Sequence, residues 1–245
     1  MGLFTMFEVG GKVRDELLGL ESKDVDYVAV PNDSLLEKYK GAHEMFVVLE
    51  SYLHGEGFEI FLSTPNCFTI RAKFPKNHKY QGVADFVMAR KEVGYIPETR
   101  TPIVRPGTLF DDLERRDFTL NSLAKDENGN IIDYFNGLED LKNGILRTPL
   151  PTERTFNDDP LRILRAIRFS ITKGFKITAT MAITIDCYNY EKNMGVVSVE
   201  RIREELFKCF KHDTLETLKV LNEFPMLKNY IFKNNILWLK PTLEQ

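Results

Sequence analysis

The pair Asp24 and Asp26, which stands before the apolar run 27–30, constrains the fold more than any other feature of the chain. Side chains alternate between the two faces of a β-strand, so both aspartates point to one face and Val25 to the other. Two carboxylates on one face suit hard divalent cations, and paired Mg²⁺ ions can clamp the attacking and leaving oxygens in nucleotidyl transfer. The pattern predicts such a site on a sheet, although an Asp-x-Asp pair also occurs on solvated strand edges.

A glycine turn lies just upstream of this pair. Gly10 and Gly11 separate a strand-like run at 4–9 from a helical run at 13–18, and such a turn can present backbone amides to a polyphosphate. Arg14 follows in the first helical turn and can fork onto a phosphate. By itself, a glycine pair before a helix is more often plain turn chemistry.

Asp85 is a candidate third carboxylate. It lies in the strand-like run 82–88, which we expect to neighbour the strand of the aspartate pair. A surface aspartate on an edge strand is an equally good interpretation of the same pattern.

Composition places the chain among ordinary globular proteins. It has 245 residues, 43% of them hydrophobic, which is enough for one large domain or two modest ones. The three cysteines show no CxxC spacing, so neither a zinc site nor a disulfide framework is indicated. No signal peptide and no apolar run of membrane-spanning length is present. We expect a cytoplasmic protein that makes no membrane contact.

The pattern of elements changes along the chain. Five strand-like runs interleaved with short helices come first (4–9, 25–30, 58–62, 67–74 and 82–88, with helices at 13–18 and 35–54). Helical spacing dominates afterwards (161–171, 179–188, 199–210 and 215–224). The pattern of elements predicts an α/β head followed by an all-helical extension. We expect domains at 1–148, 149–211 and 212–245.

Charge follows the same division. The net charge is −3, but residues 1–148 carry more acidic than basic side chains and residues 149–211 the reverse. A nucleic-acid partner would therefore contact the middle segment.

Two adjacent cations next to an acid stand before another short helical run. Arg115 and Arg116 can bind phosphates, and Asp117 can accept from a ribose hydroxyl. The alternative is a charged helix N-terminus with Asp117 as its cap and both arginines solvated.

A ridge of polar side chains lies along the helix predicted at 161–171. Asp159 suits the N-cap and Pro160 the first helical position. At about 100° per residue, Asp159, Arg162 and Arg165 fall on one ridge, opposite the apolar face. The ridge is either an intrahelical salt-bridge ladder or a device that reads a nucleobase.

The second interpretation has a chemical basis. Cytosine and adenine both show an exocyclic amino donor beside a ring-nitrogen acceptor, whereas uracil and guanine show carbonyl acceptors and a ring N–H. A carboxylate that accepts from the amino group, with a guanidinium that donates to the ring nitrogen, would accept C and A and reject U and G.

Taken in order, several segments resemble the class II tRNA nucleotidyltransferase and bacterial poly(A) polymerase family, over roughly residues 6–210. They are GGKVRDELLG with SKDVDYVAV, ERRDFTLNSLA, DYFNGLEDLKNGILRT, DDPLRILRAIRF and VERIREEL. The resemblance implies an α+β fold with a polymerase-β-like nucleotidyltransferase head, in which helices pack on a mixed sheet, followed by an all-helical neck and body. It also implies template-independent addition of C and A (CCA) to tRNA 3′ ends from CTP and ATP. The family's motif usually has Glu where Asp158 stands.

Residue roles carry over from this resemblance. Asp24 and Asp26 look like the ligands of two Mg²⁺ ions, with Asp85 as the possible third carboxylate. Gly11, with its neighbour Gly10, and Arg14 look like triphosphate contacts.

The later motifs carry over in the same way. Arg116 and Asp117 resemble the phosphate and ribose binders, and Arg115 stands beside them. By the same resemblance, the segment DDPLRILRAIRF supplies a base-reading pair and two neighbouring nucleotide contacts (Asp159 and Arg162, then Arg165 and Arg168).

Three alternatives stay open at this stage. A poly(A) polymerase, or an enzyme that adds only CC or A, shares every motif, and a non-catalytic RNA-binding protein retains the fold. Residues 89–102 resemble the loop that family members use in switching from C to A, which favours full CCA addition. The chain ends earlier than family members usually do, so the acceptor is tRNA or another RNA 3′ end. The helical C-terminal part can also serve a homo-oligomer.

Overall fold

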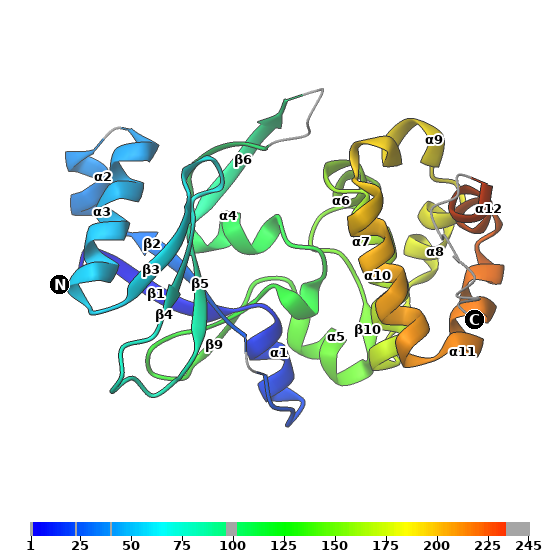
Figure 1. The fold of residues 1–245 in the computed structure, drawn as a ribbon, viewed down its shortest axis with the longest axis horizontal. Helices are drawn as coiled ribbons and strands as arrows, with labels where there is room; N and C mark the ends of the chain where they lie inside the picture. Colours follow the sequence, from blue (N-terminus) through cyan, green and yellow to red (C-terminus); the bar gives the residue numbers. More distant parts are fainter. Residues whose placement is uncertain (1, 23, 40, 97–101, 234–245) are drawn as a thin grey trace, which may run out of the picture. The chain divides into compact units, whose positions relative to one another are not determined.

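The computed structural model describes residues 2–22, 24–39, 41–96 and 102–233 (Figure 1). The chain divides into two compact units, Met1–Leu141 and Lys142–Gln245, which are described in turn. The division falls somewhat before the boundary expected near residue 148. The separation of 149–211 from 212–245 stays a prediction, and residues 234–245 lie outside the described ones.

A seven-stranded mixed sheet forms the first unit, in the order β3-β4-β5-β2-β1-β8-β9. The central pair β2 and β5 is parallel, and the other neighbouring strands are antiparallel. The predicted strands are confirmed to within two residues: β1 (Phe4–Val9), β2 (Val25–Pro31), β3 (Glu59–Thr64), β4 (Thr69–Lys73) and β5 (Val83–Met88). Two short strands were not predicted: β8 (Leu123–Lys125) and β9 (Ile131–Asp133).

The two faces of this sheet have separate cores. On one face, Tyr27 of β2 and Phe86 of β5 pack with Phe46 and Leu49 of helix α3 (Ala42–Gly55). On the other face, Val28 packs in a smaller cluster together with two leucines of helix α4 (Leu109–Glu114). Figure 1 shows α3 and α4 on opposite sides of the strands. Each large apolar side chain that is fully buried contributes about 1.5–3 kcal/mol to the stability of the fold. Because side chains alternate along β2, Asp26 lies on the face that α4 covers.

The single helix predicted at 35–54 is wrong. The chain forms α2 (Asp33–Lys38) and α3, and Tyr39 and Gly41 between them have extended backbone angles. The Asn32 side chain accepts from the backbone N–H of Leu35, which caps α2 earlier than expected. Glycine is a poor helix former, so the break falls where Gly41 stands.

The segment 89–102, expected to be a flexible loop, contains regular structure at both ends. Strands β6 (Arg90–Tyr95) and β7 (Pro102–Pro106) pair as an antiparallel hairpin. Residues 97–101 lie outside the described residues. The helix α4 follows and begins with a capping box formed by Thr108 and Asp111.

Helix α5 (Gly137–Asn143) holds the short 3-10 turn η2 (Thr119–Asn121) in place. The buried Thr119 hydroxyl donates to Asp140 at 2.7 Å. Gly137 packs so closely on this turn that an added Cβ would lie 2.2 Å from the carbonyl oxygen of Thr119.

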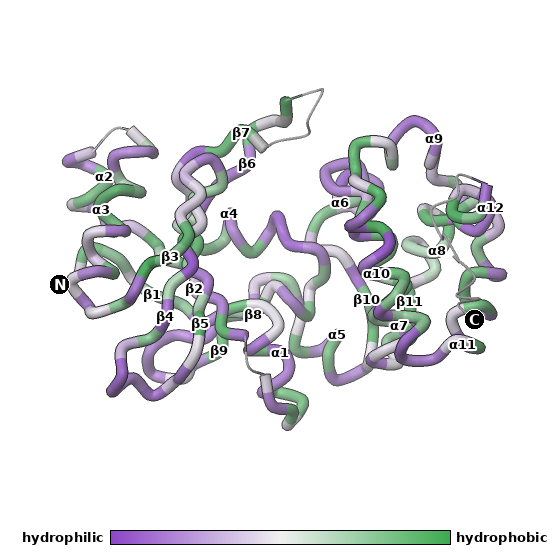
Figure 2. The backbone as a smooth tube through the Cα atoms, in the orientation of Figure 1, coloured by the Kyte–Doolittle hydropathy of each residue, from purple (hydrophilic) through white to green (hydrophobic). Residues whose placement is uncertain are grey.

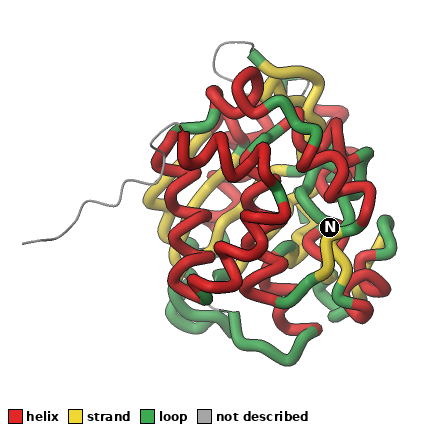
Figure 3. Tube along the Cα trace, turned by 90° about the vertical axis from the view of Figure 1, so that its right-hand side faces the viewer, coloured by secondary structure: helices red, strands yellow, loops and turns green. Residues whose placement is uncertain are grey.

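The second unit is almost entirely helical (red in Figure 3), with one short pair of parallel strands, β10 (Ile145–Leu146) and β11 (Lys176–Ile177). Its helices are α6 (Thr152–Asp158), α7 (Leu161–Lys173), α8 (Ala179–Asp186), α9 (Tyr190–Asn193), α10 (Val199–His212), α11 (Thr214–Glu223) and α12 (Pro225–Lys233). The four helices predicted here are confirmed, and α6, α9 and α12 were not predicted.

Helices α7 and α10 pack against each other through their apolar faces. Buried residues recur along α7 at helical spacing, among them Leu164, Ile167 and Ile171, as predicted. Figure 2 shows hydrophobic and hydrophilic residues alternating along both helices. No helix in the described part of the chain combines the length and hydropathy of a membrane-spanning segment.

The close approach of Gly137 to η2 generates a stability prediction. Gly137→Ala should lower the free energy of unfolding by about 1–3 kcal/mol, because backbone must shift to admit the methyl group. Gly55→Ala is the matched control, since nothing lies within 4 Å of a Cβ at the end of α3. The measurement is the urea midpoint of both variants, and equal midpoints would contradict the packing described.

Candidate active site

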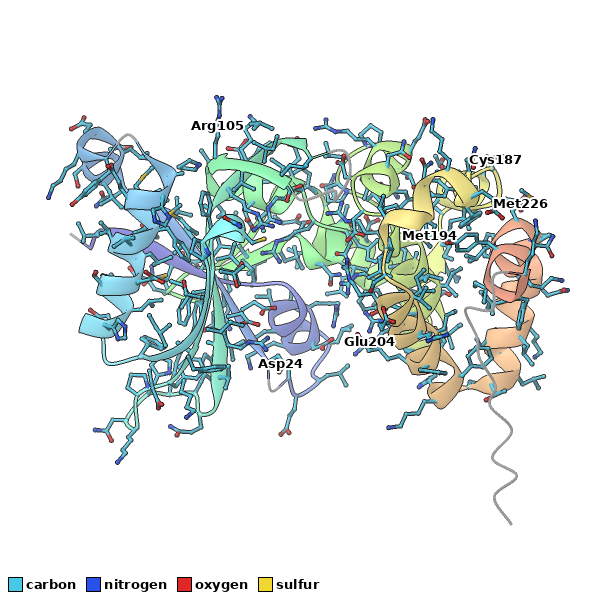
Figure 4. All side chains as sticks on the ribbon, turned by 45° about the horizontal axis from the view of Figure 1, so that its top comes forward. Asp24, Arg105, Cys187, Met194, Glu204 and Met226 are labelled. Carbon is cyan, nitrogen blue, oxygen red and sulfur yellow. The ribbon has the colours of Figure 1, made fainter. Side chains whose placement is uncertain are left out.

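The predicted aspartate pair lies where β2 begins. Asp24 precedes the strand and is exposed (Figure 4), whereas Asp26 is its second residue and Val25 between them is buried. In the sheet, Asp26 stands opposite Val9 of β1 and opposite Asp85 of β5. Burial raises the pKa of Asp26; the Arg116 cation opposes the rise, while Asp85 and Asp24 add to it.

The glycine turn lies against this carboxylate. Gly10 has a φ of 70°, a conformation that costs glycine little. A Cβ on Gly10 would stand 3.1 Å from Nη1 of Arg116 and 3.3 Å from Oδ2 of Asp26. Three motifs that are far apart in the sequence therefore meet at one point: the turn, the aspartate pair and the double arginine.

A buried aspartate orients the two arginines. Asp112 of α4 is fully buried; it accepts from Arg115 through Oδ1 and from Arg116 through Oδ2 at 3.0 Å. Burial alone would raise the pKa of Asp112, but the two guanidinium groups hold it below the ordinary value. The guanidinium of Arg115 also lies 3.5 Å from Glu92 of β6, which ties it to the hairpin.

Arg116 is engaged less completely. Its Nη2 is held by Asp112, its Nη1 stands beside Gly10, and its buried Nε has no hydrogen-bond partner among the described residues. Buried donors are normally paired, so this guanidinium is suited to receive an anion.

Asp117 belongs to a chain of side chains that joins η2 to helix α1 (Gly11–Leu17). Arg14 donates to Asp15 at 2.9 Å and to Asn121 at 2.6 Å, and Asn121 donates to Asp117 at 2.9 Å. The predicted triphosphate contact Arg14 is thus buried within this chain. Gly11, the other predicted contact, is the first residue of α1.

Asp85 lies beside the pair but is held by another residue. Arg71 of β4 donates to both of its oxygens, Nε to Oδ1 at 2.7 Å and Nη2 to Oδ2 at 2.6 Å. No group of three or more His, Cys, Asp or Glu within the described residues is arranged to hold a metal ion.

The two aspartates nevertheless fit Mg²⁺. This ion is usually bound through one or two carboxylates together with substrate phosphates, rather than by an all-protein cage. The electrostatic influence of Asp24 and Asp85 on Asp26 means that negative charge gathers here. The donor set that suits the ion is therefore Asp24 and Asp26, and their role as ligands stays a prediction.

In the second unit, Asp159 stands before α7 with extended backbone and accepts from the Leu161 N–H at 3.1 Å. The helix begins at Leu161, and its N-cap residue is Pro160 instead of the predicted Asp159. The Asp159 carboxylate also lies 3.8 Å from the guanidinium of Arg201 on α10. Arg162 donates to the backbone oxygen of Thr155 at 3.4 Å.

The two later arginines differ in their partners. Arg168 donates through Nε to the buried Glu205 of α10 at 2.6 Å, and its guanidinium also lies over the ring of Phe169. Arg165 lies over the same ring at a centroid distance of 5.8 Å. The ion pair to Glu205 joins α7 to α10, so Arg168 has a structural role whatever else it binds.

Sequence reasoning missed three residues of this site: Asp112, Asn121 and Arg71. Asp112 precedes the double arginine by three and four residues, a helical spacing that signals a shared partner. Asn121 lies in the motif already singled out. Arg71 carries no local signal, because only strand pairing brings it to Asp85.

The burial of Asp26 generates a stability prediction in the absence of divalent cations. Since the pKa of Asp26 is raised in the folded state, its ionised form weakens folding above that pKa, and the effect fades as pH falls through it. Asp26→Asn should raise the unfolding midpoint in chelating buffer at pH 7 by about 2–4 °C, which corresponds to ~1 kcal/mol.

Asp126→Asn is the control with the opposite sign. Hydrogen bonds from Asn130 lower the pKa of the exposed Asp126, so its removal should not stabilise the protein. A midpoint for Asp26→Asn at or below that of the unaltered protein would contradict the prediction.

Comparison with known proteins agrees with this geometry. The sequence family described as Poly A polymerase head domain matches residues 6–147. The multifunctional CCA protein of Nitrosomonas eutropha is 39% identical over 175 residues, which are 70% of this chain and 36% of that protein.

Two solved structures are similar across most of the chain. The Bacillus stearothermophilus CCA-adding enzyme in complex with CTP has a TM-score of 0.72 and 27% identity, covering 93% of this chain and 49% of that one. The Thermotoga maritima CCA-adding enzyme complexed with tRNA has a TM-score of 0.69 and 27% identity, covering 94% and 48%. The chain thus spans about half or less of the length of these relatives. It belongs to the poly(A) polymerase head-domain family.

Proposed function

We propose that this chain is a template-independent nucleotidyltransferase that adds C and A, as CCA, to the 3′ end of tRNA from CTP and ATP. The observation that carries the proposal is the meeting of Gly10, Asp26 and Arg116 at one point. An anion receptor beside a carboxylate pair is what transfer from a nucleoside triphosphate requires. Relatives named as CCA-adding enzymes, one solved with CTP and one with tRNA, support the choice of substrates.

Each group of the first unit has a definite task in this proposal. Asp24 and Asp26 would hold Mg²⁺, which would lower the pKa of the RNA 3′-hydroxyl and neutralise the leaving pyrophosphate. Arg116 offers its unpaired Nε and its Nη1 to the triphosphate, and Gly10 leaves room for that approach. Asp117, oriented by Asn121, accepts from the ribose hydroxyl. The protein acts mainly by positioning and by screening charge.

Base choice is assigned to the second unit. Asp159 accepts from the amino group that cytosine and adenine share, and Arg162 donates to the neighbouring ring nitrogen. Asp159 lies 3.8 Å from Arg201 of α10, so a cation from another helix also faces its carboxylate.

The remaining expectations follow from the proposal. Three free cysteines suit the reducing cytoplasm, where we expect the protein to act on tRNA. Association of two chains through the helical C-terminal part stays a prediction. A poly(A) polymerase is the second candidate, because the matching family takes its description from that activity.

The first test is nucleotide incorporation into a tRNA that lacks its terminal CCA, with each nucleotide alone and with CTP and ATP together. We expect addition that stops after three nucleotides, and loss of it in Asp24→Ala. Asp33→Ala, an exposed acid at the start of α2, is the control that should retain activity. Long A-tails from ATP alone would favour the poly(A) polymerase, and full activity in Asp24→Ala would exclude chemistry at this pair.

The second test concerns base selectivity. Asp159→Ala or Arg162→Ala should reduce discrimination against UTP and GTP by about tenfold or more, since one bidentate base contact is worth about 1–3 kcal/mol. Arg154→Ala on α6 is the control, because its side chain is 62% exposed. The measurement is kcat/KM for all four nucleotides. Unchanged ratios in both variants would leave the polar ridge with a structural role only.

A further inference from the structure

The contact between Arg71 and Asp85 occupies both oxygens of the carboxylate nearest the aspartate pair. Arg71 and Asp85 stand opposite each other on β4 and β5, and Asp85 in turn stands opposite Asp26 on β2. Residues that face each other across strands point to the same side of the sheet. The Arg71 guanidinium therefore lies on the face that carries Asp24 and Asp26, and both of these carboxylates act on its charge.

A divalent cation and this guanidinium need the same lone pairs. The two hydrogen bonds run in parallel, from Nε to Oδ1 and from Nη2 to Oδ2, in the fork geometry typical of arginine and carboxylate. While the fork is closed, Asp85 cannot offer either oxygen along the direction that Arg71 occupies. This explains why Asp85 can stand in register with Asp26 without a three-carboxylate cluster being formed in the described residues.

The paired hydrogen bonds between Arg71 and Asp85 are accessible to solvent. The side chain of Arg71 is 49% exposed and that of Asp85 is 28% exposed, so water competes for both groups. Ion pairs of this exposure are weak, because solvent screens the attraction and long side chains lose freedom when they are held. A doubly charged ion held by two further carboxylates competes for Asp85 with a much larger charge.

We propose that Arg71 is an exchangeable counter-ion of Asp85, which it releases when a divalent cation binds at Asp24 and Asp26. The inference rests on the metal site of the proposed function. Arg71 balances the crowded carboxylates while no metal is bound, and it lowers the affinity for the metal by competing for the third ligand. It is a positioning residue, since it acts on the metal through Asp85.

A plain cross-strand salt bridge is the competing explanation. Opposite charges on neighbouring strands stabilise many sheets and need no metal. The two explanations differ in one measurable quantity: a salt bridge affects stability alone, whereas a counter-ion also affects metal affinity.

The test uses Mn²⁺ as the probe, with the full chain and without nucleotide, and measures free Mn²⁺ by electron paramagnetic resonance. Arg71→Met should bind Mn²⁺ about three- to tenfold tighter than the unaltered protein, and Arg71→Lys should lie between them because it lacks the fork. Lys73→Met is the matched control: the same strand and face, exposed, and 3.4 Å from Glu59 instead of Asp85. It should bind Mn²⁺ as the unaltered protein does.

Two further variants test the route through Asp85. Asp85→Asn should weaken Mn²⁺ binding, and adding Arg71→Met to it should produce no gain, because the contested ligand is gone. Thermal unfolding of each variant confirms that it is folded. The rise in midpoint caused by Mn²⁺ should be larger for Arg71→Met than for Lys73→Met.

Unchanged or weaker Mn²⁺ affinity in folded Arg71→Met would overturn the proposal, as would a gain that persists in the double variant. Failure of the proposed function is separable from this outcome. A protein that incorporates nucleotides while Arg71→Met leaves Mn²⁺ affinity unchanged overturns the exchange alone. A protein that incorporates none, although Arg71→Met tightens Mn²⁺ binding through Asp85, overturns the activity alone.

Discussion

The parallel pairing of β2 with β5 places Asp26 directly across from Asp85, and the chemistry of the first unit depends on this register. A shift by one residue would turn one of the two carboxylates into the opposite core, where Tyr27 and Phe86 now stack at 5.1 Å. The same strand register therefore fixes both the stacked rings and the neighbouring carboxylates. Packing of the rings on one face holds the like-charged carboxylates close together on the other face. A bound cation would offset the repulsion between them.

The buried charge of Asp112 is tolerated because two cations match it. Asp112 has no exposed surface, yet two guanidinium groups hold its pKa low, so removing either arginine would leave an uncompensated buried charge. The structure also distinguishes Arg115 from Arg116, which are adjacent in the sequence and have the same side chain. Arg115 is directed toward Glu92 of the hairpin, while Arg116 is directed toward Gly10 and has one buried donor that pairs with none of the described residues.

Periodicity in the sequence predicted the features that depend on neighbouring residues along the chain. The alternation around Asp24 and Asp26, the five strands and the apolar face of α7 follow from periodicity, and the structure has them. The mixed sheet was implied by the family resemblance. The prediction of one helix at 35–54 was wrong because the apolar spacing continues through Gly41, whereas the backbone at Gly41 is extended and interrupts the helix. The role of Arg71 was not predicted, because its partner Asp85 becomes its neighbour only when β4 and β5 pair.

The arginines of the two units show why a motif alone does not assign a role. Guanidinium groups are always charged, so what each can bind depends on the partners it already has. Arg168 is held by the buried Glu205, and Arg14 by Asp15 and Asn121; these side chains join elements together. Arg116 has a buried donor without a partner among the described residues. A ligand that brings negative charge can satisfy that donor without breaking an existing contact.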